Sequence, residues 1–157
     1  MLDVEKLLLL IRENNLPSII NSILSKKELP LGLGRYFRYP ETVEIHYTKD
    51  EYGSFFGEDL LPLWQDASYF LTAFKVSKKK YIVFYPQNLG DEGLYNLMNW
   101  EQLMSHHFKE FHLFPGISHA QLRQVAPLFE YENVEYLISV LEGKTDEAEF
   151  LQSIEDT

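Results

Sequence analysis

The chain has 157 residues, with 24 acidic side chains against 14 basic ones and no cysteine. Its length is that of a single domain, and eleven Phe and ten Tyr supply a hydrophobic core, which argues against a disordered chain. The lack of cysteine excludes disulfide bonds and thiolate metal sites. The formal net charge of −10 repels phosphate backbones, so direct binding to nucleic acid is not expected.

The beginning of the chain shows no signal for export or membrane insertion. It has no basic segment, and its apolar run Leu7–Ile11 is too short for a signal peptide or a membrane span. Together with the lack of cysteine, this predicts a cytoplasmic protein that does not contact a membrane.

Two short helices are predicted before any strand. Asp3 suits the N-cap of a helix over 4–14, whose apolar residues recur at the spacing of one buried helix face. Pro17 suits the first turn of a second helix, over 17–26. The segment 29–34 combines one proline with two glycines and is predicted to be a loop.

The densest run of strand-forming residues follows. Aromatic and β-branched residues predict three consecutive strands, with a polar hairpin loop between the last two. These strands are Leu60–Trp64, Tyr69–Lys75 and Lys80–Tyr85. Shorter strands are predicted at 35–39, 42–48 and 94–98. Because neighbouring strands are joined by short turns, we expect a mainly antiparallel sheet of about five to six strands.

Four helices are predicted after the sheet, each preceded by a residue suited to cap it. The caps are Asn99, Ser118, Asn133 and Thr145, and the helices extend over about 100–111, 119–129, 134–141 and 146–154. Pro127 is expected to end the second of these helices early, and Gly143 to close the third at its C′ position.

The order of helices, strands and helices predicts an α+β fold in one domain over 1–157. Its parts are the N-terminal helices at 1–27, the sheet at 35–98 and a helical region with an acidic tail at 99–157.

Most of the negative charge lies near the C-terminal end. From Glu130 onward there are nine acids and one base, Lys144, which gives a net charge of −8. Blocks of like charge are commonly solvated helical tails. A docking face for a basic protein partner is the alternative interpretation.

Histidines and loop carboxylates are the candidates for chemistry. His106 and His107 are adjacent on a predicted helix and point about 100° apart, so they cannot easily share a metal ion and are expected to face solvent. The loop pairs Glu58-Asp59 and Asp91-Glu92 could serve a hydrolase, although adjacent acids are also common in turns.

No serine stands in a Gly-x-Ser-x-Gly context, and no metal or cofactor motif is found. We therefore expect a protein that is not an enzyme and needs no cofactor, with a small hydrolase that uses the loop carboxylates as an alternative.

Several elements follow one order: a Gly-to-Pro segment, paired aromatic strands, and a late helix with an aromatic residue near its start. They are Gly57–Asp66, Tyr69–Lys75, Tyr81–Tyr85 and the helix from Asn99 to Phe108, with Leu16-Pro17 between the two N-terminal helices. This order resembles the SUKH superfamily, which holds bacterial immunity proteins and relatives of a yeast cell-wall-synthesis regulator. The chain departs from the family pattern at Lys26–Pro30, where the family often has glycines, and in its longer acidic region after Pro115.

The resemblance implies an α+β fold without catalysis that binds a protein, often a polymorphic nuclease toxin made by the same bacterium. An acidic surface would complement the basic site of such a nuclease. We expect the partner to contact aromatic and acidic residues on or beside the sheet, and a regulatory adaptor that docks a basic protein through the acidic tail is the alternative. The candidate contact residues are Glu58, Asp59, Trp64, Asp66, Tyr69, Tyr81 and Tyr85.

Overall fold

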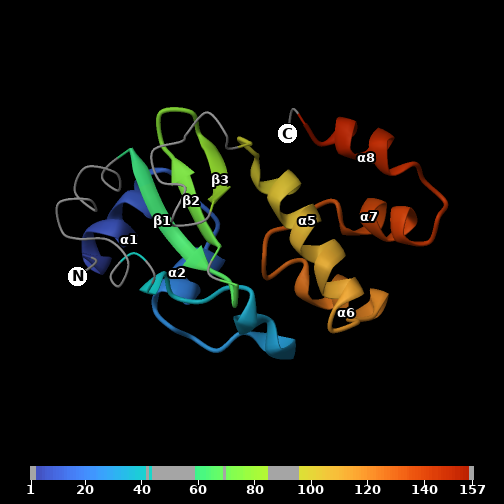
Figure 1. Cartoon of the computed structure of the whole chain (residues 1–157), viewed down its shortest axis with the longest axis horizontal. Coiled ribbons are helices and arrows are strands. Elements are labelled where there is room, and N and C mark those ends of the chain that lie inside the picture. The colour runs from blue at the N-terminus through green and yellow to red at the C-terminus, as the bar shows by residue number, and fades with distance from the viewer. Residues whose placement is uncertain (1–2, 42, 44–58, 69, 85–95, 156–157) are drawn as a thin grey trace. The chain divides into compact units, whose positions relative to one another are not determined.

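The computed structural model describes residues 3–41, 43, 59–68, 70–84 and 96–155. The chain divides into two compact units, Met1–Leu97 and Met98–Thr157. The first unit contains helices and an antiparallel sheet, and four helices lie in the second (Figure 1). The predicted α+β class is confirmed.

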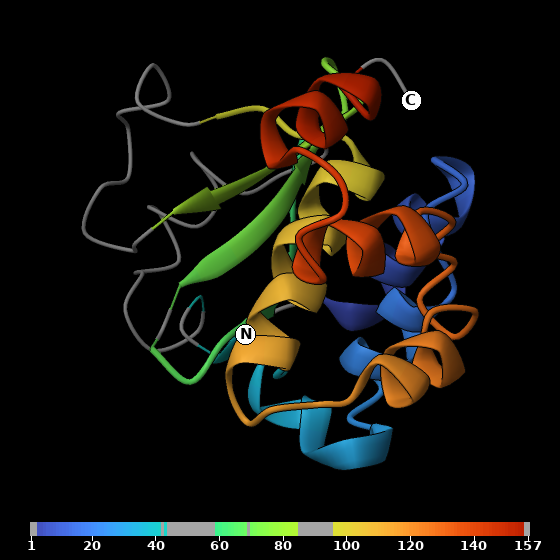
Figure 2. The ribbon, with the colours of Figure 1, turned by 90° about the vertical axis from the view of Figure 1, so that its right-hand side faces the viewer.

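The two predicted N-terminal helices are present as α1 (Val4–Glu13) and α2 (Ile19–Leu24). The side chain of Asp3 caps α1 by accepting a hydrogen bond from the backbone N–H of Lys6 at 3.1 Å. Helix α1 packs on α2, and α2 packs on the first strand, so these helices lie on one side of the sheet (Figure 2).

The segment predicted as a loop at 29–34 instead forms η1 (Pro30–Arg35), a short 3₁₀ helix. Leu31 and Gly32 interrupt it with positive φ angles of 56° and 70°. Pro30 stands at the first turn, where a proline is tolerated because the N–H groups of that turn have no acceptor within the helix. The glycines and proline thus produce a helical turn with a kink.

The three central strands are confirmed as β1 (Leu60–Gln65), β2 (Leu71–Lys75) and β3 (Lys80–Phe84). They form an antiparallel sheet in the order β1-β2-β3. The register between β1 and β2 shifts between Pro62 and Trp64. Pro62 stands beside this irregularity, and prolines within sheets are usually found on edge strands or at bulges.

The prediction of five to six strands is wrong, since the sheet has three strands in the described residues. At 35–39 only an isolated bridge forms, between Arg38 and Gln65. Pro40 follows directly and cannot donate a hydrogen bond, which limits any longer pairing there. The predicted strands at 42–48 and 94–98 lie largely outside the described residues.

The second unit consists of α5 (Trp100–Leu113), α6 (His119–Val125), α7 (Val134–Leu141) and α8 (Glu147–Ser153). Capping boxes begin α5 and α6, each formed by a predicted cap and a glutamine three residues later. Helix α6 ends before Pro127, as predicted. Gly143 adopts a φ of 75° after α7, and the next N–H bonds back to the Ser139 carbonyl at 2.9 Å, which confirms the predicted helix end.

The predicted cap of the last helix is wrong by one residue. The carboxylate of Asp146 accepts the hydrogen bond from the Glu149 N–H at 3.1 Å, whereas the Thr145 hydroxyl pairs with the Ser139 hydroxyl. A carboxylate at this position also interacts favourably with the positive end of the helix dipole.

An aromatic cluster forms the centre of the second unit. The ring of Phe108 lies 5.2 Å from Phe111, 5.7 Å from Phe129 and 4.7 Å from Tyr131, between ring centroids. All four residues are buried. The Tyr131 hydroxyl is 2.6 Å from the Ser105 hydroxyl, which satisfies its polar end within the core.

The carboxylate of Glu101 joins α5 to the segment before α7. One of its oxygens accepts hydrogen bonds from the Glu132 N–H, the Asn133 N–H and the Asn133 side-chain amide, at 2.9, 3.1 and 2.7 Å. Burial raises the pKa of Glu101 above its usual range, and the neighbouring Glu132 charge adds to the effect despite these hydrogen bonds. Glu101 is therefore a buried acceptor whose oxygen, more than its charge, holds this connection.

We predict that Glu101→Ala lowers the free energy of unfolding by about 2 kcal/mol, because three donors lose their acceptor. Glu101→Gln keeps an acceptor oxygen and is expected to cost less than about 1 kcal/mol. The measurement is urea unfolding followed by circular dichroism. Glu132→Ala, which alters an exposed side chain in the same contact, is the control and should stay within about 0.5 kcal/mol of the parent. Equal losses in the Ala and Gln variants would contradict the prediction.

The prediction that His106 and His107 both face solvent is correct for His106 and wrong for His107. His106 is exposed, and its Nε2 atom lies 3.2 Å from the Glu110 carboxylate. His107 is buried and stacks on Phe111, one helical turn further along α5. The 100° step between neighbours puts one histidine on the inward face of the helix. Burial, with a smaller effect of His106, lowers the pKa of His107 to about 3.

This burial should make stability depend on pH. In the unfolded chain His107 takes up a proton near its usual pKa of about 6.5, whereas in the folded chain it does so only near 3. The unfolded state therefore binds more protons between these values. Stability is expected to fall by about 1.4 kcal/mol for each pH unit below pH 6 from this residue alone.

The measurement is the unfolding free energy at several pH values from about 6 down to about 4, which lie between the pKa values of the unfolded and folded states. His107→Leu should have a shallower slope than the parent, while the control His106→Gln should keep the parent's slope. A His107→Leu slope equal to that of the parent would contradict the assignment.

Candidate functional site

The strongest feature of the molecular surface is the uneven distribution of charge between the two units. Residues 98–157 contain eleven acids and three bases, a net charge of −8, and residues 1–97 contain thirteen acids and eleven bases, a net charge of −2. The second unit therefore carries eight of the ten excess negative charges in fewer residues.

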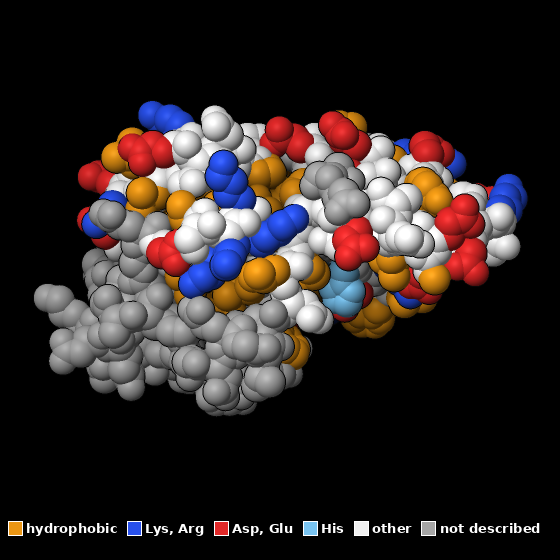
Figure 3. Space-filling view, turned by 90° about the horizontal axis from the view of Figure 1, so that it is seen from above, with side chains coloured by type: hydrophobic (Ala, Val, Ile, Leu, Met, Phe, Trp, Pro, Cys, Tyr) orange, Lys and Arg blue, Asp and Glu red, His pale blue; other side chains and the backbone are white. Residues whose placement is uncertain are grey.

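The carboxylates of the second unit that follow residue 129 are all exposed in the described part of the chain. We call this set the acidic surface, and Figure 3 shows part of it in red. It comprises Glu130, Glu132, Glu135, Glu142, Asp146, Glu147, Glu149 and Glu155.

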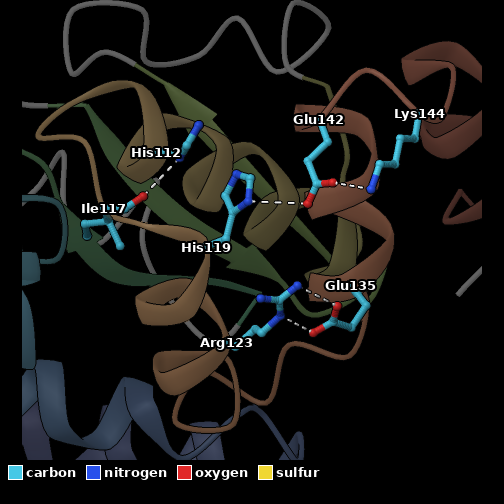
Figure 4. A network of polar contacts seen from close by, with 7 residues as sticks. All are labelled: His112, Ile117, His119, Arg123, Glu135, Glu142 and Lys144. Carbon is cyan, nitrogen blue, oxygen red and sulfur yellow. Dashed lines mark hydrogen bonds and ion pairs between the residues drawn. The ribbon is translucent and has the colours of Figure 1, made fainter.

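The three bases of this unit are each engaged by one of these carboxylates. Lys109 on α5 pairs with Glu147 on α8. Arg123 on α6 holds both oxygens of Glu135 on α7, at 2.6 and 3.2 Å (Figure 4). The third base is Lys144, whose ammonium lies 2.6 Å from the Glu142 carboxylate.

These pairings keep their carboxylates ionised. The hydrogen bond from Arg123 lowers the pKa of Glu135, and the hydrogen bond from Lys144 lowers the pKa of Glu142. Because the bases of the unit are occupied in this way, its remaining carboxylates are an excess of negative charge that the unit's own lysines and arginines do not balance.

Two members of the acidic surface lie close to the start of α5. The Glu132 N–H bonds to the carboxylate of Glu101, and the Glu155 carbonyl accepts a hydrogen bond from the Asn99 side chain at 3.1 Å. Asn99 and Glu101 are two residues apart, so these long-range contacts bring acids from residues 132 and 155 to one end of the helix. The fold thus brings the backbone of two acidic residues that are distant in sequence to one end of α5.

A pair of histidines lies at the other end of α5. The rings of His112 and His119 are 4.8 Å apart between centroids. His112 Nδ1 lies 3.0 Å from the Ile117 carbonyl, and His119 Nδ1 lies 3.5 Å from the Glu142 carboxylate (Figure 4). Among the described residues there is no group of three histidines or acids arranged to hold a metal ion.

The predicted contact residues on the sheet occupy several environments. Trp64 and Tyr81 are buried, and their rings pack on Phe37 and Phe74 at centroid distances of 5.2 and 4.9 Å. They therefore contribute to the core of the first unit rather than to its surface. Successive side chains of a strand point to opposite faces, and all six residues of β1 are buried, so both faces of this strand are covered. The other three candidates on and beside the sheet, Glu58, Tyr69 and Tyr85, lie outside the described residues.

The two remaining candidates, Asp59 and Asp66, organise turns. Asp66 accepts hydrogen bonds from the N–H groups of Ser68 and Phe70, at 2.8 and 3.0 Å. Asp59 accepts hydrogen bonds from the Ser77 N–H at 2.8 Å and from the Ser77 hydroxyl, and it lies 3.2 Å from the Lys75 ammonium. Burial alone would raise the pKa of Asp59, but these contacts outweigh it and the pKa is lowered.

The hydrolase alternative relied on four loop carboxylates. Of these, the structure describes only Asp59, whose oxygens are engaged by the hairpin as above. The other three, Glu58, Asp91 and Glu92, lie outside the described residues.

We predict that Asp59→Ala speeds hydrogen exchange of the Ser77 amide by about fivefold, since an exposed charge-assisted contact contributes up to about 1 kcal/mol. The measurement is amide exchange by NMR on the full chain. Asp66→Ala is the matched control, because it removes a carboxylate that holds a different turn. The same acceleration at Ser77 in both variants would show that the hairpin does not depend on Asp59.

The sequence analysis placed the candidate contact residues at the sheet and gave a docking role of the acidic tail as the alternative. The signal for the acidic surface was present in the base count, since Lys109, Arg123 and Lys144 are the only bases after residue 97. Which carboxylates they neutralise depends on contacts between α5 and α8 and between α6 and α7, and sequence order does not give these contacts.

Comparisons with models of protein families, with curated proteins and with solved structures give no match to this chain. Among the described helices, none combines the length and the apolar character needed to cross a bilayer.

Proposed function

We propose that this protein is a non-catalytic binding module that docks a basic protein through its acidic surface. The observation that carries this proposal is the excess of exposed carboxylates on a unit whose three bases are already paired. A complementary cationic partner gains attraction from such a surface and is steered toward it during encounter.

The structure of the second unit supports a docking role in a further way. Three members of the acidic surface, Glu135, Glu147 and Glu149, stand on α7 and α8. A hydrogen bond donated by the Asn99 side chain and one accepted by the Glu101 carboxylate fix the segments that carry Glu155 and Glu132. Charges held on a fixed scaffold lose less conformational freedom on binding than charges on a flexible tail.

The partner class that we propose first is a nuclease toxin, which makes the protein an immunity protein that neutralises the toxin by direct binding. The resemblance to the SUKH superfamily supports this choice, and so does charge, since a nuclease needs a basic surface for nucleic acid. A regulatory adaptor for another basic protein is the second candidate, because the same acidic surface serves either function.

The test is isothermal titration of the full chain with a panel of catalytically inactive basic nuclease domains, repeated at rising salt concentration. We expect saturable binding to a member of the panel that weakens with salt, because exposed charges are screened over about 10 Å at 0.1 M salt. The double variant Glu132→Lys with Glu149→Lys should weaken that binding at least about tenfold.

The matched control is the double variant Glu5→Lys with Glu13→Lys, which makes the same change in net charge on α1 of the first unit. Equal weakening in both double variants would show that only net charge matters and would contradict a defined docking surface. Binding to basic proteins of other classes, with none to the nucleases, would favour the adaptor.

A further inference from the structure

The first unit contains a cavity of about 590 Å³. The cavity has no part in the function proposed above, which depends on the acidic surface of the second unit. It lies between the end of α2, the η1 segment and Gln65 at the end of β1. Its size falls within the range of about 300–1,000 Å³ that is usual for small-molecule sites.

Part of the cavity wall is apolar. Ile23, Leu29 and Phe37 line it, and all three side chains are buried. The buried Gln65 also lines it, and its backbone is held by two hydrogen bonds to Arg38 at 2.8 and 2.9 Å. These buried residues provide an apolar wall with one amide side chain, which is typical of a site that holds an organic ligand.

The charged residues of the cavity are exposed and lie close together in sequence and in space. Three are cations and two are carboxylates, so the lining has a net charge of +1 in a chain whose net charge is −10. They are Lys26, Lys27, Arg38, Glu28 and Glu41. Considering only contacts with other described residues, none of the five forms an ion pair within 4.0 Å.

One of these cations is held beside an aromatic ring that also lines the cavity. The Lys26 ammonium lies 4.5 Å from the centroid of the Tyr39 ring. This cation–π contact limits the positions of the lysine side chain and keeps its charge next to the cavity.

We propose that this cavity binds a small organic monoanion, a carboxylate on an apolar or aromatic body. The apolar wall would bury the body, and the three cations would attract the carboxylate. The charges of the lining sum to +1, which one ligand carboxylate neutralises, and a second ligand carboxylate would lie beside the two lining carboxylates with no excess positive charge to balance it. This site is independent of the acidic surface and of the partner proposed for it.

The probes are three compounds that share a phenyl body: 3-phenylpropionate with one negative charge, phenylsuccinate with two, and the neutral 3-phenylpropionamide. The measurement is a titration of the ¹⁵N-labelled full chain followed by NMR. We expect 3-phenylpropionate to cause saturable shifts at the amides of residues 26–39 and of Gln65, with a Kd on the order of 1 mM. The amide and the dianion should bind at least about threefold more weakly.

Two variants test the assignment to this cavity. Arg38→Gln removes one exposed cation and should weaken 3-phenylpropionate about threefold, whereas Lys78→Gln in the β2–β3 hairpin is the matched control and should not. Gly34→Leu should weaken binding, because Gly34 lines the cavity and a leucine side chain there would occupy part of it. A Cβ built at Gly34 meets no atom within 4 Å, and a thermal unfolding curve checks that the variant is folded.

Three results would overturn the proposal. One is the absence of saturable shifts with 3-phenylpropionate at millimolar concentration. Another is equal binding of the neutral amide, which would remove the role of charge. The third is unchanged binding in a folded Gly34→Leu variant, which would place the ligand elsewhere.

Discussion

The helical unit depends on hydrogen bonds made by three consecutive residues at the start of α5. Asn99 donates from its side chain to the carbonyls of Ile154 and Glu155, Trp100 donates from its indole to the Phe129 carbonyl, and Glu101 accepts from the segment that begins α7. Two segments distant in sequence, 129–133 and 154–155, are thereby fixed to one helical turn. Each bond satisfies a group whose burial would otherwise be costly, so these contacts select one arrangement of the unit as well as stabilise it.

The same arrangement explains how a unit with a net charge of −8 can fold. Repulsion among its carboxylates opposes a compact state. Burial of the Phe108 cluster opposes that repulsion, and the ion pairs of Lys109 and Arg123 connect different helices and reduce it where helices meet. The excess acids remain at the surface, where water and salt screen them. Core packing and surface charge are thus separate in space, which lets the surface vary in charge without disturbing the core.

The sequence predicted elements well wherever the signal was local. Capping residues and the polar hairpin loop located α1, α5 and the three central strands to within a few residues, because caps and turns act over three or four positions. The errors arose where the outcome depends on distant contacts. A short strand was predicted at 35–39, but a strand needs a partner strand, and in the described residues only Arg38 pairs, in a single bridge with Gln65. Trp64 and His107 were predicted to lie at the surface but are buried. The sequence pattern alone does not show which face of a strand or helix is covered by other elements. The acids of the acidic surface were evident in the sequence as a run of like charges. Which of them pair with Lys109 and Arg123 could be known only from the folded structure.

Pro62 in β1 has a consequence for the behaviour of the chain at high concentration. β1 is at one end of the three-stranded order, a position that in many proteins can recruit a strand from another molecule and start fibrils. Pro62 offers no N–H to such a strand, and the outer N–H and carbonyl of Gln65 are already bonded to Arg38. An incoming strand would therefore meet an interrupted ladder at both positions, so this edge of the sheet is protected against self-assembly by its own backbone chemistry.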